Sequence, residues 1–577
     1  MENMICIKAL HKKGPKKDLE NKRGIFLANI LYKTFERIII ARNEAQIERM
    51  LSNHQCGARK GLSTADNLMV VSAMIERNGC LGRNTYIFFT DAVKYFDKLW
   101  LKNCLLNMNK AGFPLYDTAL LYHLNHKATI SVDNPSGETD DFTVYDVVKQ
   151  GTISGPLICC AEVDQINKVN EIVAVPYGPE VMIGMPEYVD DVSTVGEGQD
   201  IRIGIRNCRE MEKFKFSYGL IKTKYMVIHT GKDTPEIIDE KVKQGSVEET
   251  KEYPYVGLWI NQNGNLSSHI QCIKQKVKSS LTELMSTGHD SKVGMEAIRV
   301  KLKLYSSTTI HAMVYRLEVW EGTTPKEYQE FERIQANCLR KILNLPCSTP
   351  YIGILMETGF WPVEQYVWYR KLMLYHNIIH SKDTRLSKII WQQQYKYNMP
   401  HSFNSNVQIL GKYLEVNCHP SHVALVLKSH WKKLIKESIN KYTLEKFQPM
   451  LQSMTKVRFL KRDQLERKLY VEKCSSYLTQ KIMLVRLNMN KTKENFRGKQ
   501  DNSKCRLCSK DKETTEHLLG CSAMGTNTID TTYLNQVDNI QMWKEIVDRV
   551  ERFETAIDEL ECDENKEQRE EDLPMQQ

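Results

Sequence analysis

Three aspartates stand in sequence settings that suit divalent cations. Asp91 follows a run of β-branched and aromatic residues at 85–90, which predicts a strand that ends in a carboxylate. Asp190 and Asp191 are adjacent between short apolar stretches, which favours the turn of a hairpin, although a solvated turn would look the same. Neighbouring carboxylates repel each other when ionised, which raises their pKa values. Two divalent cations about 3.5–4 Å apart would neutralise this repulsion. Because such a pair of ions activates an attacking oxygen and stabilises the leaving one, the three acids indicate phosphoryl transfer.

A second group of side chains has the spacing of a metal site. Cys505, Cys508, His517 and Cys521 form the pattern C-x₂-C-x₈-H-x₃-C. Three thiolates and an imidazole satisfy tetrahedral zinc and leave no open position for catalysis. Unrelated thiols are the alternative, but in a reducing compartment such a cluster favours metal over disulfides. The spacing therefore predicts a structural zinc knuckle.

Composition limits the class of protein. The chain has 577 residues, of which 41% are hydrophobic, so it can bury the cores of two to four domains. Lysine and arginine exceed aspartate and glutamate by 80 to 71, and this moderate excess fits a polyanionic partner. The 16 cysteines are scattered, and no signal-peptide pattern or membrane-length apolar run is visible. These features predict a soluble intracellular protein with reduced thiols that does not enter a membrane.

The periodicity of apolar residues changes along the chain. Up to about residue 260, strand-like runs alternate with helical spacing, whereas from about residue 265 the pattern is helical for a long way. Basic and aromatic residues are interleaved at 368–376 and 430–441.

Seven blocks of sequence around the acids carry a family resemblance. They are residues 11–27, 55–66, 91–97, 149–156, 188–191, 216–225 and 253–259. In order and spacing they resemble the two fingers motifs and motifs A to E of the reverse transcriptases of non-LTR (LINE-like) retrotransposons. Ala58, where phenylalanine is more usual, and Gly155, between Ser154 and Pro156, depart from the family pattern. Neither change removes a carboxylate.

The resemblance implies an α+β fold of the right-hand polymerase type, followed by a mostly helical extension with the zinc knuckle. The expected regions are 1–264 for fingers and palm, 265–345 for a helical thumb, 346–500 for a helical nucleic-acid-binding extension, 501–525 for the knuckle, and 526–577 for a helix and acidic tail. The implied activity is RNA-directed DNA synthesis, in which a primer 3′ hydroxyl attacks a deoxynucleoside triphosphate.

The resemblance also implies catalytic roles. Asp91 and Asp190 would hold two Mg²⁺ ions, and Asp191 would act as a third ligand or mainly through its charge. Lys222 would donate a proton to the departing pyrophosphate, with Lys224 as a competitor for that role.

Basic residues of the first two blocks would contact the substrate. Arg23 and Lys17 would face the triphosphate, with a solvated surface as the alternative. Arg59 would reach phosphate or template.

Other residues would shape the nucleotide site. Phe96 corresponds to the aromatic plate that excludes a 2′ hydroxyl, with ordinary core packing as the alternative. Asp97 would be structural or would orient substrate. Gln150 and Gly151 would lie against the nascent base pair, because glycine lets a backbone approach closely.

The expected partners are an RNA template, a DNA primer or target DNA, and deoxynucleoside triphosphates, and the family implies action in the nucleus. The first block begins close to Met1 and little sequence follows Cys521, so we expect no endonuclease domain. Two alternatives stay open. One is an inactive or repurposed remnant that only binds nucleic acid, and the other is an RNA-templated RNA polymerase, which Phe96 disfavours.

Overall fold

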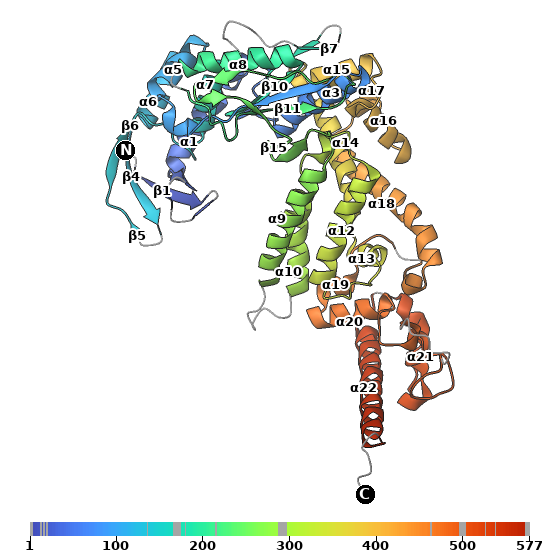
Figure 1. Cartoon of the computed structure of the whole chain (residues 1–577). Helices are drawn as coiled ribbons and strands as arrows, with labels where there is room; N and C mark the ends of the chain where they lie inside the picture. Colours follow the sequence, from blue (N-terminus) through green and yellow to red (C-terminus); the bar gives the residue numbers. More distant parts are fainter. Residues whose placement is uncertain are drawn as a thin grey trace.

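The computed structural model describes most of the chain (Figure 1). The residues outside the description are 1–3, 12–13, 16–17, 19–20, 135–136, 166–174, 179–180, 214–215, 233, 287–296, 462–463, 496–502, 526, 537 and 572–577.

Up to residue 261 the described chain mixes strands and helices. The strands are β1 (Met4–His11), β2 (Lys22–Leu27), β3 (Thr85–Phe89), β4 (Lys127–Asn134), β5 (Gly137–Glu138), β6 (Phe142–Tyr145), β7 (Val175–Gly178), β8 (Val181–Ile183), β9 (Glu187–Tyr188), β10 (Asp191–Gly196), β11 (Lys224–Ile228), β12 (Lys241–Val242), β13 (Gly245–Ser246), β14 (Glu248–Glu249), β15 (Glu252–Tyr255) and β16 (Leu258–Asn261). The helices are α1 (Ile30–Arg42), α2 (Glu44–Met50), α3 (Thr64–Cys80), α4 (Tyr95–Lys98), α5 (Leu101–Lys110), α6 (Leu115–Asn125), α7 (Ser154–Val163) and α8 (Gly198–Glu212).

Two five-stranded sheets organise this part. The first has the order β2-β1-β4-β5, with β6 also paired to β4, and its β1–β4 pair is parallel. The second has the order β14-β11-β3-β10-β9. In Figure 1 the first sheet lies at the far left, near the N-terminus, and the second lies beneath α8.

The second sheet is covered on both faces, which explains why every residue of β3 is buried. Tyr86 and Phe88 pack with α8, whereas Ile87 and Phe89 belong to the main core, which also contains α3. Alternate residues of a strand point to opposite faces, so an uninterrupted apolar run is what a sheet between two helices requires. The covered sheet fixes the end of β3, and Asp91 is the second residue after that end.

After residue 261 the description contains helices without further named strands. They are α9 (Ser267–Ser286), α10 (Ala297–Leu304), α11 (Ile310–Met313), α12 (Pro325–Ile342), α13 (Tyr351–Thr358), α14 (Val363–Ile379), α15 (Leu386–Lys396), α16 (Phe403–Tyr413), α17 (Pro420–Val423), α18 (Lys428–Ser453), α19 (Leu469–Lys473), α20 (Ser476–Arg486), α21 (Thr515–Gly520) and α22 (Ile540–Glu571).

One helical segment is interrupted in the structure, although the spacing of its apolar residues predicts a single helix over residues 298–318. A π-helical turn at Tyr305–Thr309 separates α10 from α11, and Arg316 has a φ of 62° beyond the end of α11. Ser307 and Thr308 both donate side-chain hydrogen bonds to the carbonyl of Leu304. Such bonds compete with the regular helical pattern and commonly distort it.

None of the helices in the described ranges combines the length and the apolar character that crossing a bilayer demands.

Candidate catalytic site and metal centre

Strand pairing brings the predicted carboxylates together. β10 runs antiparallel to β3, with Ser193 opposite Phe89, and the Thr90 N–H donates to the Val192 carbonyl at 3.0 Å. Continuing this register places Asp191 across from Asp91. Side chains that face each other in such a pair have Cβ atoms about 4.5–5.5 Å apart. Asp91 therefore meets the hairpin that carries Asp190 and Asp191.

The backbone after Asp91 is held by the segment that precedes Lys222. The Gly219 N–H donates to the Asp91 carbonyl at 3.0 Å, and the Val93 N–H donates to the Ser217 carbonyl at 2.8 Å. These bonds orient the end of β3 and bring residues 217–222 to the carboxylates.

The turn between β9 and β10 is strained, and hydrogen bonds from the Gln55 side chain stabilise it. Val189 has a φ of 58°, a conformation that β-branched residues rarely adopt. The side-chain oxygen of Gln55 accepts from the Val189 N–H at 3.0 Å, and its amide nitrogen donates to the Val189 carbonyl at 3.2 Å. Gln55 is fully buried, and the same nitrogen donates to Glu187 at 3.0 Å. A Cβ at Gly57 would lie 2.5 Å from the Val189 nitrogen, so only glycine fits there.

Gln55 is a positioning residue that sequence reasoning missed, and its replacement tests the support. In Gln55→Glu a carboxylate would face the carboxylate of Glu187 and could no longer donate to Val189. We expect the affinity for Mn²⁺ to fall about 10- to 100-fold, as when a residue that orients metal ligands is lost. Isothermal titration calorimetry with Mn²⁺ measures this affinity. Gln165→Glu is the control, because that amide bonds the Ala161 carbonyl instead; an equal loss in both variants would contradict the role.

Burial and mutual repulsion disfavour the ionised acids. Burial, together with the charge of Asp91, raises the pKa of Asp190 despite a backbone hydrogen bond that lowers it. Desolvation and the charges of Asp190 and Asp91 raise the pKa of Asp191 to about 6. Carboxylate oxygens crowded in this way are hard ligands, and they suit divalent cations that would neutralise them. The donor set thus fits Mg²⁺.

These shifts predict a pH dependence. The pKa of Asp191 is about 6 in the folded chain instead of its ordinary 3.8, so between these values the folded state holds more protons than the unfolded state. The cation-free chain should therefore lose stability as the pH rises through that window. Cations compete with these protons, so Mn²⁺ affinity should rise up to about pH 6 and level off above about pH 7. Mn²⁺ titration followed by electron paramagnetic resonance measures this; a flat profile would contradict it, and Asp191→Asn should weaken the rise.

Two cationic side chains act on these acids. The Lys222 ammonium donates to Asp91 Oδ1 at 2.6 Å. Arg23, exposed on β2, lies close enough to lower the pKa of both Asp190 and Asp191. By contrast, Lys224 donates to Glu248 at 2.6 Å. Of the two competing lysines, Lys222 is therefore the one that contacts the acids.

The loop of Gln150 and Gly151 is fixed against β2. The Phe26 N–H donates to the Gln150 carbonyl at 2.8 Å. Gly151 has a φ of 114°, and a Cβ there would lie 2.7 Å from the Phe26 carbonyl oxygen. Behind the loop, buried Lys149 donates to the Leu124 carbonyl at 2.9 Å. This packing joins the loop to the strand that carries Arg23.

Phe96 and Asp97 lie on the short helix α4, which residues 90–94 connect to the end of β3. Phe96 is half-buried and packs against the main core, so part of its ring is accessible and both sequence interpretations fit. Asp97 is exposed.

Arg59 is predicted to contact phosphate or template, but in the structure its side chain contacts other residues of the protein. Its side chain is only 4% exposed and is paired with Glu48 at 3.0 Å. It also donates to the carbonyls of Ser52 at 2.7 Å and Gln55 at 3.0 Å. A guanidinium with its donors used in this way supports the loop that carries Gln55 and is not free for a ligand. Lys17, the other predicted basic contact, lies outside the described residues.

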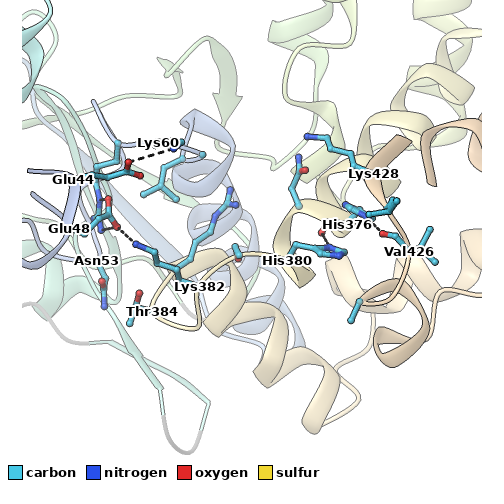
Figure 2. Close-up of a pocket in the computed structure, with 18 of the residues that line it drawn as sticks. Glu44, Glu48, Asn53, Lys60, His376, His380, Lys382, Thr384, Val426 and Lys428 are labelled. Atoms are coloured by element: carbon cyan, nitrogen blue, oxygen red, sulfur yellow. Dashed lines mark hydrogen bonds and ion pairs between the residues drawn. The ribbon is translucent and has the colours of Figure 1, made fainter. Parts of the chain in front are cut away.

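Arg59 borders a cavity of about 730 Å³ between α2 and the ends of α14 and α18. Figure 2 shows the ion pairs on one wall, where Lys60 lies 3.5 Å from Glu44 and Lys382 lies 3.7 Å from Glu48. The opposite wall carries His376, which hydrogen-bonds the Val426 carbonyl. The ion pair of Lys382 with Glu48 connects the segment after α14 to α2, in the first part of the chain.

The predicted zinc ligands converge. One ligand atom from each of Cys505, Cys508, His517 and Cys521 lies within 4.8 Å of the others. The Cys505 and Cys521 sulfurs are 3.9 Å apart, and Cys508 Sγ is 3.3 Å from His517 Nε2. Zinc–sulfur bonds of about 2.3 Å in a tetrahedron require a sulfur–sulfur distance of about 3.8 Å. The cluster fits a tetrahedral metal ion.

The surrounding residues hold this cluster in place. Asp511 Oδ2 lies 3.7 Å from His517 Nδ1, on the side of the ring away from the cysteine. Arg549 of α22 donates to the carbonyls of Leu518 at 3.1 Å and Cys521 at 3.2 Å. The cluster is therefore built into the C-terminal helices.

Part of the chain is similar to known proteins. Residues 12–260 match the family model described as reverse transcriptase (RNA-dependent DNA polymerase). A curated relative, the "probable RNA-directed DNA polymerase from transposon BS" of Drosophila melanogaster, is 19% identical over 364 residues, which cover 59% of this chain. The chain spans only 38% of that relative's length.

Among solved structures, the telomerase of Candida albicans in complex with the TWJ fragment of telomeric RNA aligns with 68% of this chain and 64% of its own. Its sequence identity is 11% and its TM-score is 0.29. The family match and the curated relative confirm the resemblance to a transposon reverse transcriptase.

Proposed function

We propose that the protein extends a primer 3′ hydroxyl on an RNA template with deoxynucleoside triphosphates. The premise is that residues 12–260 match the reverse transcriptase family. In this proposal the first sheet forms the fingers, the second sheet forms the palm, and α9 to α12 form the thumb of a right-hand polymerase. The later helices would bind nucleic acid, and the Cys₃His cluster would hold a structural zinc ion.

One observation carries the proposal: three carboxylates from β3 and the β9–β10 hairpin meet beside Lys222 and Arg23. Asp91 contacts Lys222 directly, and Arg23 lowers the pKa of Asp190 and Asp191. Two Mg²⁺ ions held by these acids would supply electrostatic stabilisation to the attacking and leaving oxygens. The cationic side chains would bind the triphosphate, whose charge is the main obstacle to the reaction.

The substrate would lie between elements that the fold already fixes. Gln150 and Gly151 would support the nascent base pair, because their loop is pinned to β2 beside Arg23. Phe96 would contact the sugar of the incoming nucleotide and disfavour a 2′ hydroxyl.

The contact between Lys222 and Asp91 predicts a rate effect. We expect Lys222→Gln to slow nucleotide addition about 100-fold, within the range for a lost general acid, and to remove the alkaline limb of the pH–rate profile. Lys224→Gln is the matched control, because Lys224 is held by Glu248 and should retain nearly the full rate. Single-turnover extension over a range of pH measures both; equal losses would contradict the assignment to Lys222.

Primer extension tests the proposed function itself. The full chain, with Mg²⁺ and a poly(rA) template primed by oligo(dT), should incorporate deoxynucleotides and largely exclude ribonucleotides. Ribonucleotide incorporation at a similar rate would instead favour an RNA-templated RNA polymerase.

An inactive nucleic-acid-binding remnant is the second candidate. Tight binding of the primed template without extension, in Mg²⁺ and in Mn²⁺, would favour it. The three converging carboxylates weigh against it, because a chain that only binds has no need of them.

A further inference from the structure

A second cavity lies among the later helices, away from the carboxylates. Its volume is about 700 Å³, and its walls come from the π-turn and α11, the segment after α13, α14 and α18. In Figure 1, α18 lies on the far side of α9 and α12 from the first sheet. Basic and aromatic residues are interleaved in residues 368–376 and 430–441, and both stretches contribute to the lining of this cavity.

One wall of the cavity carries positive charge that is not neutralised. Lys432 and Lys436 are exposed one turn apart on α18 and line the cavity. Among the residues that the structure describes, neither has an ion pair. Lys433 and Lys441 on the same helix differ, because they lie 3.9 Å from Glu437 and 2.5 Å from Glu415.

The remaining charges of the lining are largely matched. Arg370 is paired with Glu318 at 2.8 Å, and Arg467 lies 3.8 Å from Glu472. Both of these arginines and Glu472 line the cavity. The unmatched charge is therefore that of the two lysines.

Aromatic side chains also line the cavity, next to α18. Trp361 and Tyr369 are half-buried, with ring centroids 5.7 Å apart at 50°. The indole nitrogen of Trp361 donates to Asn440 at 2.6 Å, and Asn440 lies on the same face of α18 as the two lysines. The ring is thus held in a fixed orientation beside the cations. Fixed aromatic rings beside a cationic track are how proteins bind single strands: bases stack on the rings and phosphates meet the charges.

We propose that this cavity binds a single-stranded nucleic acid, with a base stacked on Trp361 or Tyr369 and phosphates at Lys432 and Lys436. It is a site additional to the one at which the primer is extended. The inference deepens the proposed function, because an unpaired part of the template is a natural occupant. RNA and DNA share this chemistry, and the test below separates them.

Binding of labelled oligonucleotides tests the site. Fluorescein-labelled U12 and dT12 are titrated with the full chain at several salt concentrations, and fluorescence anisotropy gives the affinity. A blunt duplex in excess occupies the proposed polymerase site. We expect Lys432→Ala/Lys436→Ala to weaken binding and to reduce the salt slope by about 1.4, because each lost phosphate contact accounts for about 0.7 on single strands. Lys433→Ala/Lys441→Ala removes the same charge from the same helix and should change neither.

The aromatic wall is tested separately. Trp361→Ala should weaken binding about 5- to 150-fold, the effect of losing one stacked base, and Trp361→Phe should restore part of it. Thermal unfolding checks that each variant folds. With 5-iodouridine in U12, the photochemical crosslink should map to Trp361 or Tyr369, and this readout does not depend on the stability of a variant.

Several results would overturn the site: equal weakening by both lysine pairs, competition by polyglutamate as effective as that by unlabelled U12, or crosslinks confined to the first 261 residues. Stronger binding of U12 than of dT12 would identify RNA as the occupant, and the reverse would identify DNA. Extension of a primer with a one-nucleotide template overhang should be unchanged in the control variant Lys433→Ala/Lys441→Ala. A chain that cannot extend primers but shows the expected binding differences would contradict the polymerase and leave this site standing.

Discussion

Asp190→Asn is expected to reduce primer extension on an RNA template about 1,000-fold or more. The asparagine keeps the size of the side chain but loses the charge that would hold a divalent cation between it and Asp91. Stabilisation by such an ion is worth several kcal/mol in a transition state, and each 1.36 kcal/mol is a factor of ten in rate. Single-turnover extension measures the effect, and Asp91→Asn should behave in the same way.

The loss should be one of chemistry and not of folding. Asp190 repels its neighbours and its pKa is raised by burial and by Asp91, so its neutral replacement should not lower the unfolding temperature of the cation-free chain. Binding of the primed template should also persist. Asp383→Asn is the control, because that carboxylate is 80% exposed and pairs with Lys388. Full extension by Asp190→Asn would overturn the assignment of the metal ligands.

Removal of the metal from the Cys₃His cluster should destabilise the C-terminal helices. Cys505→Ser/Cys521→Ser, or a zinc chelator, is expected to abolish the binding of one zinc ion per chain and to make residues 503–571 sensitive to protease. Zinc binding in isolated finger peptides is worth about 10–16 kcal/mol, which is a large part of the stability of so small a unit. Elemental analysis and limited proteolysis measure the two effects.

The damage should remain local. The contacts of Arg549 tie α22 to the carbonyls of Leu518 and Cys521, so these helices depend on the cluster, whereas the sheets that carry the acids do not contain it. Cys80→Ser/Cys347→Ser removes two exposed thiols and should leave zinc content unchanged. A chain that retains zinc after the loss of Cys505 and Cys521 would contradict the ligand set.

The strand and the hairpin that carry the carboxylates could be predicted, because each depends on residues that are neighbours in the chain. The apolar run before Asp91 predicts its strand, and β3 covers Thr85–Phe89. The hairpin at Asp190 and Asp191 could likewise be predicted, since a two-residue turn lies between β9 and β10. The zinc ligands converge because their spacing along a short segment already limits the distances between them.

Arg59 shows where such reasoning ends. A basic residue in a family block suggests a phosphate contact, yet the acceptors around it decide its role: Glu48 from α2 and the carbonyls of Ser52 and Gln55 use its donors. Likewise, Lys222 and Lys224 cannot be told apart in sequence, and only the position of Glu248 beside β11 separates them.

The sequence by itself determined which residue types were available and in what order: a strand that ends in an acid, a paired acid in a turn, and four spaced zinc ligands. Tertiary structure alone decided that Gln55 supports the strained turn from 134 residues away, and that Trp361 and Lys436 line one cavity. The physical reason is range. Strand, turn and short-loop preferences act between neighbours in the chain, whereas a hydrogen bond or a shared wall depends on how distant segments pack together.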